Sequence, residues 1–198
     1  MGYDYAQSGA YFVTVVTHGR ECLFGEIADG ETRLNEAGRM VQTVWEELSI
    51  HYPGVETDAF VVMPNHIHGV VVLVGAGPRA CPDVGLGVAT GPRACPDAGP
   101  GNTERGQPQG VAPTLSLPDI MHRFKTLTTK RYADAVKQSG WPPFPGRLWQ
   151  RNYYEHVIRD EESLNRIRQY IHDNPARWEF DHENPAAMSL EPEDAWRV

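Results

Sequence analysis

The sequence is poor in cysteine, and the three that it has stand far apart. Cys22, Cys81 and Cys95 form no Cys-x-x-Cys pair. An odd number of widely spaced thiols argues against a disulfide framework and a zinc knuckle, and it favours incidental thiols in a reducing compartment.

Long hydrophobic runs are also missing, although 40% of the 198 residues are hydrophobic. No stretch approaches about 18 consecutive apolar residues, so we expect no membrane span. The first residues lack a basic region followed by a long apolar stretch, so we expect no secretory signal and a cytoplasmic location. No G-x-x-x-x-G-K-Ser/Thr loop occurs, which agrees with a function that does not use ATP.

Positive charge is scarce, with a formal net charge of −8, and this at first argues against a nucleic-acid partner. The charge is unevenly distributed, however. Residues 119–178 carry 11 Lys and Arg against 7 Asp and Glu, a balance of +4. A local basic surface of this kind is compatible with phosphate binding, and an ordinary charged helix surface is the alternative.

The order of expected elements indicates an α+β protein. We expect strands or paired strands at 10–17, 58–64, 66–74 and 148–158, and helices at 35–52, 117–138 and 160–173. A short hairpin that turns at Asp29-Gly30 is expected before the first helix. This order predicts a ferredoxin-like or RRM-like antiparallel sheet with helices on one face, plus a C-terminal helix.

We interpret residues 1–178 as one domain, interrupted by an insert at about 75–118. The insert is rich in Gly and Pro, contains the heptapeptide GPRACPD twice, and has no apolar periodicity. Such a segment cannot bury enough apolar surface to fold, so we expect a flexible loop. Residues 179–198 are acidic and are expected to form a loosely attached tail.

Two histidines form the first candidate site. His66 and His68 are two residues apart on an expected strand, so both imidazoles point to one face while Ile67 enters the core. Two neighbouring imidazoles are half of a site for a divalent metal. Histidines that are merely hydrogen-bonded on a sheet surface are the alternative.

The last expected helix supplies a second candidate site. Tyr170 and Asn174 are four residues apart and therefore share a helix face. A tyrosine hydroxyl is a possible nucleophile for a phosphodiester, and an asparagine oxygen is a possible metal ligand. A core aromatic is the alternative for Tyr170.

Two stretches together resemble the single-tyrosine HUH transposases, in particular the REP-associated tyrosine transposases. The first stretch is VVMPNHIHGVVVL, and the second is LWQRNYYEHVIRDEESLNRIRQYIHDNPARW. The resemblance implies that His66, His68 and Asn174 bind Mg²⁺ or Mn²⁺. It further implies that Tyr170 attacks single-stranded DNA, leaving a 5′-phosphotyrosine and a free 3′-hydroxyl. Tyr153 and Tyr154 are rival nucleophiles, because His156 is close to them in sequence.

Single-stranded or hairpin DNA is the expected partner of a monomer or homodimer. Phosphate contacts are expected from basic side chains, and Trp149, Tyr153 or Tyr154 can stack on unpaired bases. The principal basic candidates are Arg123, Lys125, Lys130, Arg131, Arg147 and Arg151.

Three alternatives stay open from the sequence. One is a relaxase or replication-initiator type of HUH nuclease, and the absence of a helicase segment counts against it. Another is a catalytically inactive protein that binds hairpin DNA. The last is a plain metal-binding or structural α+β domain.

Overall fold

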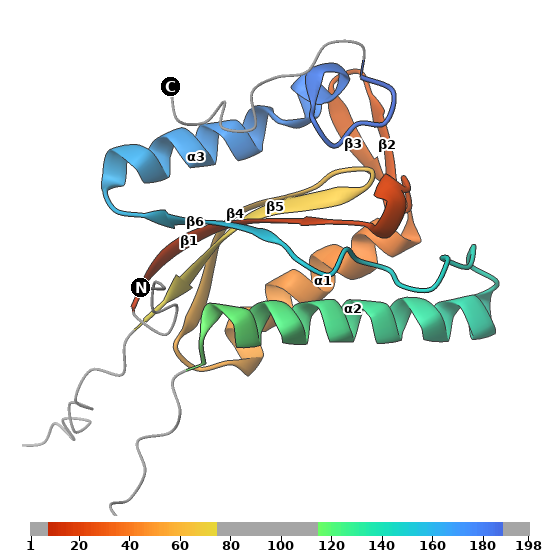
Figure 1. Cartoon of the computed structure of the whole chain (residues 1–198), viewed down its shortest axis with the longest axis horizontal. Helices are drawn as coiled ribbons and strands as arrows, with labels where there is room; N and C mark the ends of the chain where they lie inside the picture. The colour runs from red at the N-terminus through yellow and green to blue at the C-terminus, as the bar shows by residue number, and fades with distance from the viewer. Residues whose placement is uncertain (1–7, 75–114, 188–198) are drawn as a thin grey trace, which may run out of the picture.

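A four-stranded antiparallel sheet forms the centre of the computed structural model, which describes residues 8–74 and 115–187 (Figure 1). The strand order is β4-β5-β1-β6. The strands are β1 (Gly9–Val16), β4 (Val55–Val62), β5 (His66–Leu73) and β6 (Tyr154–Ile158). Because β1 pairs with β5 and β6, and β5 pairs with β1 and β4, the two central strands are β1 and the histidine-bearing β5.

Helices cover both faces of this sheet. The helices are α1 (Glu36–His51), α2 (Leu117–Ser139) and α3 (Glu161–Asp173). In Figure 1, α1 and α2 lie together on one face, and α3 lies across the other. The path β1-α1-β4-β5-α2-β6 with this strand order is the ferredoxin-like arrangement, and α3 is the additional C-terminal helix. The predicted fold class is therefore confirmed.

The alternation of the strands divides the core into two apolar clusters. On β1, Tyr11, Val13 and Val15 face α1 and α2, whereas Phe12 faces α3. Gly69 on β5 faces α1, where a Cβ atom would lie 2.4 Å from the Trp45 ring. The missing side chain lets Trp45 pack directly on the strand that carries the histidines.

Local signals account for the element boundaries. The β2 (Gly25–Ala28) and β3 (Glu31–Leu34) hairpin turns at Asp29 and Gly30, which both have positive φ, as a two-residue type I′ turn requires. The Asn35 side chain accepts a hydrogen bond from the Gly38 amide and caps α1, as expected. The short helices η1 (His18–Arg20) and η2 (Pro175–Phe180) flank the sheet end that carries His66.

Three expectations about chain segments change. The expected strand at 148–158 is regular only over β6, with one isolated bridge between Trp149 and Thr17 before it. The last residues of the expected insert belong to the described structure, in which Ser116 caps α2 and Leu117 is buried. The rest of the Gly/Pro-rich insert lies outside the described residues.

The third change concerns the acidic C-terminal segment. Its first part, through residue 187, is described and makes specific contacts: Asp181 is buried, and Glu183 pairs with Arg20. The expectation of a loosely attached tail does not hold for these residues. In the described ranges, no helix is both long and apolar enough to cross a membrane.

Candidate metal and nucleophile site

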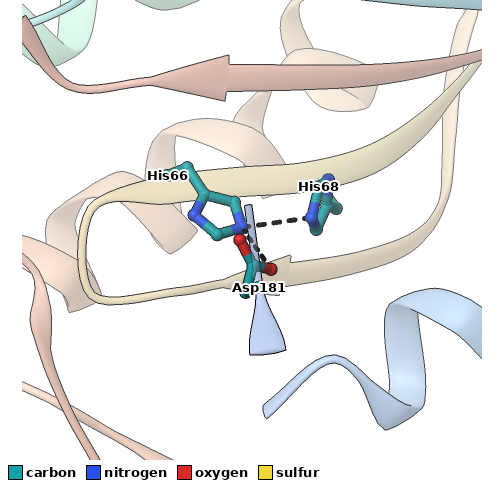
Figure 2. Close-up of side chains that lie close together, drawn as sticks. All are labelled: His66, His68 and Asp181. Atoms are coloured by element: carbon teal, nitrogen blue, oxygen red, sulfur yellow. Dashed lines mark hydrogen bonds and ion pairs between the residues drawn. The ribbon is translucent and has the colours of Figure 1, made fainter. Parts of the chain in front are cut away.

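The two histidines of β5 face each other on the α3 side of the sheet. Ile67 between them is fully buried in the α1–α2 cluster, as expected from strand alternation. The Nε2 atoms of His66 and His68 are 3.1 Å apart, and both side chains are buried (Figure 2). The sequence-based expectation that the two imidazoles share one face is correct.

Hydrogen bonds at the Nδ1 atoms orient both rings. Asn65 donates its amide hydrogens to the carbonyls of Arg20 and Glu183, at 3.0 and 2.7 Å. Its oxygen is thereby left to accept from His66 Nδ1 at 2.8 Å. His66 Nε2 therefore carries a lone pair. The Nδ1 atom of His68 lies 2.8 Å from the Thr14 hydroxyl, so both Nε2 atoms turn toward the same space.

A carboxylate from a distant part of the chain joins the histidines. Asp181 follows η2, and its Oδ2 atom is 3.8 Å from His66 Nε2 (Figure 2). Ligand atoms of His66, His68 and Asp181 all lie within 4.8 Å of one another. No spacing in the sequence predicts that Asp181 joins the two histidines, because only the tertiary structure brings it next to β5.

Tyr170 lies directly beside the histidine pair. Its ring centroid is 5.3 Å from that of His68 and 6.0 Å from that of Phe12, with the rings in edge-on contact. Asn174, one turn later, keeps helical φ and ψ at the end of α3 and is buried. Its Oδ1 atom has no hydrogen-bond partner among the described residues. Asn174 thus offers an unpaired buried oxygen on the helix that carries the nucleophile candidate, and the two facing imidazoles offer nitrogen ligands, a set of donor types that a divalent metal binds.

The helix that carries Tyr170 is attached to the sheet by a charged contact and an apolar one. Arg168 donates two hydrogen bonds to the Asp58 carboxylate on β4, at 3.0 and 2.6 Å. The guanidinium also lowers the pKa of Asp58. Ile167 and Ile171 pack into the α3-side apolar cluster. Together these contacts hold Tyr170 over β5 within the same chain.

The rival tyrosines occupy other positions. Tyr154 starts β6, is 41% exposed, and has its ring 6.4 Å from Phe12. Tyr153 packs against the α1–α2 cluster, and the Lys125 ammonium lies 5.3 Å from its ring centroid.

Burial keeps both site histidines neutral. Removal from water lowers the pKa of His66 from 6.5 to about 3, and it also lowers the pKa of His68, assisted by the neighbouring His66. Neutral imidazoles are the form that binds metal.

This neutrality predicts acid sensitivity in the absence of metal. In the unfolded chain the imidazoles bind protons near pH 6.5, whereas in the folded protein they stay neutral to lower pH. Because the unfolded state binds more protons, the free energy of unfolding decreases as the pH falls below about 6.5. We expect the Tm measured in EDTA to fall more steeply below about pH 6.5 in the wild type than in a His66→Gln/His68→Gln variant. Parallel Tm profiles for the two proteins would contradict the burial argument.

The six predicted DNA-contacting residues fall into two groups. Three of them already make contacts within the fold. Lys125 donates to the carbonyls of residues 150–152, at 3.1, 3.2 and 2.9 Å, and partial burial lowers its pKa to about 8. Arg131 forms two hydrogen bonds to Glu47, and Arg123 stacks 4.9 Å above the Tyr52 ring.

The other three, like Arg123, are exposed. Lys130 and Arg147 line a groove of about 490 Å³ between α2 and residues 146–150, and Thr126 and Thr129 lie along the same groove. Arg151 follows this segment. Lys125 also lines this groove, so three cations and two hydroxyls border it, and such a lining suits contacts to a phosphate backbone.

Comparisons with known proteins agree with this architecture. The family described as "Transposase IS200 like" matches residues 110–174. An uncharacterized protein of Haemophilus influenzae is 34% identical over 182 residues, which cover 90% of this chain and 87% of the relative. A second protein of Haemophilus influenzae, named as a REP-associated tyrosine transposase, is 24% identical over 174 residues, covering 88% and 74% of the two chains.

A solved structure shares the fold. A REP-associated tyrosine transposase bound to a REP hairpin superposes with a TM-score of 0.50 at 18% identity, covering 89% of this chain and 72% of that one. The chain belongs to the IS200-like transposase family and is homologous to the REP-associated tyrosine transposases.

Proposed function

We propose that the protein is a metal-dependent endonuclease and strand transferase for single-stranded DNA. The observation that carries this proposal is the contact between Tyr170 and His68, because it joins a candidate nucleophile to a candidate metal ligand. Membership of a transposase family supports DNA as the substrate. The relative bound to a REP hairpin supports hairpin or palindromic repeat DNA as the form that is recognised.

Tyr170 is the proposed nucleophile. Its hydroxyl oxygen attacks the scissile phosphorus and loses its proton, and the bond from phosphorus to the 3′ oxygen breaks. The departing 3′ oxygen takes up a proton, which leaves a free 3′-hydroxyl and a 5′-phosphotyrosine. Attack by a 3′-hydroxyl of another end reverses these steps and completes strand transfer without an external energy source.

His66, His68 and Asn174 are the proposed holders of Mg²⁺ or Mn²⁺. A bound divalent ion supplies Lewis-acid polarisation of a phosphate oxygen at this position. Asn65 and Thr14 contribute by fixing the two imidazoles, and the Asp58–Arg168 contact contributes by fixing α3.

The groove between α2 and residues 146–150 is the proposed contact for the DNA backbone. We expect a Lys130→Gln/Arg147→Gln variant to bind hairpin DNA more weakly. The slope of log K against log salt concentration should become shallower by about 0.7 to 0.9 for each phosphate that the variant no longer neutralises. Fluorescence anisotropy over a series of salt concentrations measures both quantities.

Arg33→Gln is the control for charge loss outside the groove, and it removes one positive charge where the groove variant removes two. Arg33 is 62% exposed on the β2–β3 hairpin, where it pairs with Asp29. The control removes one positive charge outside the groove and should leave affinity and slope close to wild type. An equal loss per removed charge in the control and in the groove variant would show a general charge effect and would contradict the assignment of the groove.

A further inference from the structure

The segment after η2 lies over the sheet end that carries His66. Glu183 contributes its carbonyl to Asn65 at 2.7 Å and its carboxylate to Arg20 at 2.7 Å. The side chain of Asn184 donates to the Trp178 carbonyl at 2.8 Å, and the Trp178 ring lies 6.0 Å from that of His66. Residues 181–184 are thus tied to the same asparagine that orients His66.

These contacts orient the carboxylate of Asp181 toward His66. Its Oδ1 atom accepts a hydrogen bond from the Glu183 amide at 2.7 Å. The other oxygen, Oδ2, faces His66 Nε2 at 3.8 Å (Figure 2). The side chain is only 6% exposed, so this carboxylate lies in the site and not in solvent. One oxygen is therefore held by the backbone while the other points at the histidine pair.

Two of the three ligand separations match those around a single ion, and the third, between His68 and Asp181, lies within 4.8 Å. Two ligands that are each about 2.1 Å from a metal lie about 3.0 Å apart at a right angle and at most about 4.2 Å apart. The 3.1 Å between the Nε2 atoms and the 3.8 Å from His66 Nε2 to Asp181 Oδ2 both fall within this range. A buried carboxylate also needs a compensating positive charge, which two neutral imidazoles do not provide.

We propose that Asp181 is a metal ligand alongside His66 and His68, and that metal binding fastens residues 181–184 over the site. The proposal rests on the metal site of the proposed function. It adds a ligand from beyond residue 174, where the match to the transposase family ends. Two imidazoles with a carboxylate favour Mn²⁺ over Mg²⁺, because nitrogen ligands suit later divalent ions better.

Asp181→Asn is the sharpest test of this ligand. If the side-chain oxygen keeps the hydrogen bond from the Glu183 amide, the amide nitrogen faces His66, and it cannot bind a metal. Isothermal titration of the full chain with Mn²⁺ alone should show at least a tenfold loss of affinity, because even the loss of an outer hydrogen-bond partner costs about 10- to 100-fold. Asp29→Asn removes the same charge at an exposed turn and should match the wild type.

Hydrogen exchange gives a second readout that does not depend on DNA cleavage. The amides of Glu183 and Asn184 donate to Asp181 in the fold. Mn²⁺ should slow their exchange in the wild type and leave it unchanged in Asp181→Asn.

Arg20→Met keeps the proposal testable if Asp181→Asn fails to fold. It removes the ion pair to Glu183 without touching a ligand, and the Mn²⁺ affinity should fall by about twofold to fivefold. If Asp181→Asn folds and its Mn²⁺ affinity is unchanged, the proposal is overturned. If Asp181→Asn does not fold, an unchanged Mn²⁺ affinity in Arg20→Met overturns it. Both outcomes hold independently of DNA cleavage. A wild type that binds Mn²⁺ through Asp181 and never cuts DNA overturns the nuclease function instead and leaves this inference intact.

Discussion

Tyr170→Phe is expected to lower the rate of hairpin DNA cleavage by at least about a thousandfold, because the side chain that forms the covalent bond is lost. The substitution removes one hydroxyl and little volume. The ring contacts with His68 and Phe12 should therefore persist, and fold and DNA affinity should survive. Incubation of single-stranded hairpin DNA with the protein and Mn²⁺, followed by a denaturing gel, measures both the cleavage product and the covalent adduct.

Tyr154→Phe is the matched control, since it removes the same hydroxyl from the exposed tyrosine of β6. We expect it to cleave DNA and to form the adduct as the wild type does. An adduct that persists in Tyr170→Phe and disappears in Tyr154→Phe would move the nucleophile to β6. A wild type that binds hairpins and cuts under no divalent metal would instead favour the inactive DNA-binding alternative.

A His66→Ala/His68→Ala variant is expected to lose DNA cleavage as completely as Tyr170→Phe does. Here the loss comes from the missing metal ligands and not from a missing nucleophile. Tyr170 remains, but the two facing nitrogen ligands are gone, so no ion polarises the phosphate. Raising Mn²⁺ to millimolar concentrations should not restore the adduct. In the wild type, EDTA should stop cleavage and added Mn²⁺ should restore it. Circular dichroism checks that the variant, which loses two buried side chains, still folds.

Thr14→Val serves as the graded control for this variant. It removes the hydroxyl that holds His68 Nδ1 at 2.8 Å and leaves both imidazoles in place. We expect a loss of Mn²⁺ affinity of about 10- to 100-fold, and added Mn²⁺ should compensate for it. Full cleavage by the double alanine variant would show that the histidines are not metal ligands.

The sequence alone was sufficient for the fold class and for the pairing of His66 with His68 on one strand face and of Tyr170 with Asn174 on one helix. Strand alternation at His66 and His68 is a local property of two residues, and so is helical spacing at Tyr170 and Asn174. Turn and cap chemistry at Asp29, Gly30 and Asn35 is equally local. The positions of these elements and the shared face of each residue pair therefore agree with the structure.

Only the tertiary structure decided which distant groups join these pairs and which cations remain exposed. Asp181 reaches His66 because residues 181–184 are held by Asn65 and Arg20, and none of these contacts leaves a periodic signal in the sequence. Lys125 appears in sequence as one more helix cation. In the folded protein its ammonium donates hydrogen bonds to three carbonyls of the segment before β6. Sequence periodicity specifies on which face of a helix or strand a residue lies. Whether a charged side chain there is available to bind DNA depends on how the elements pack against one another.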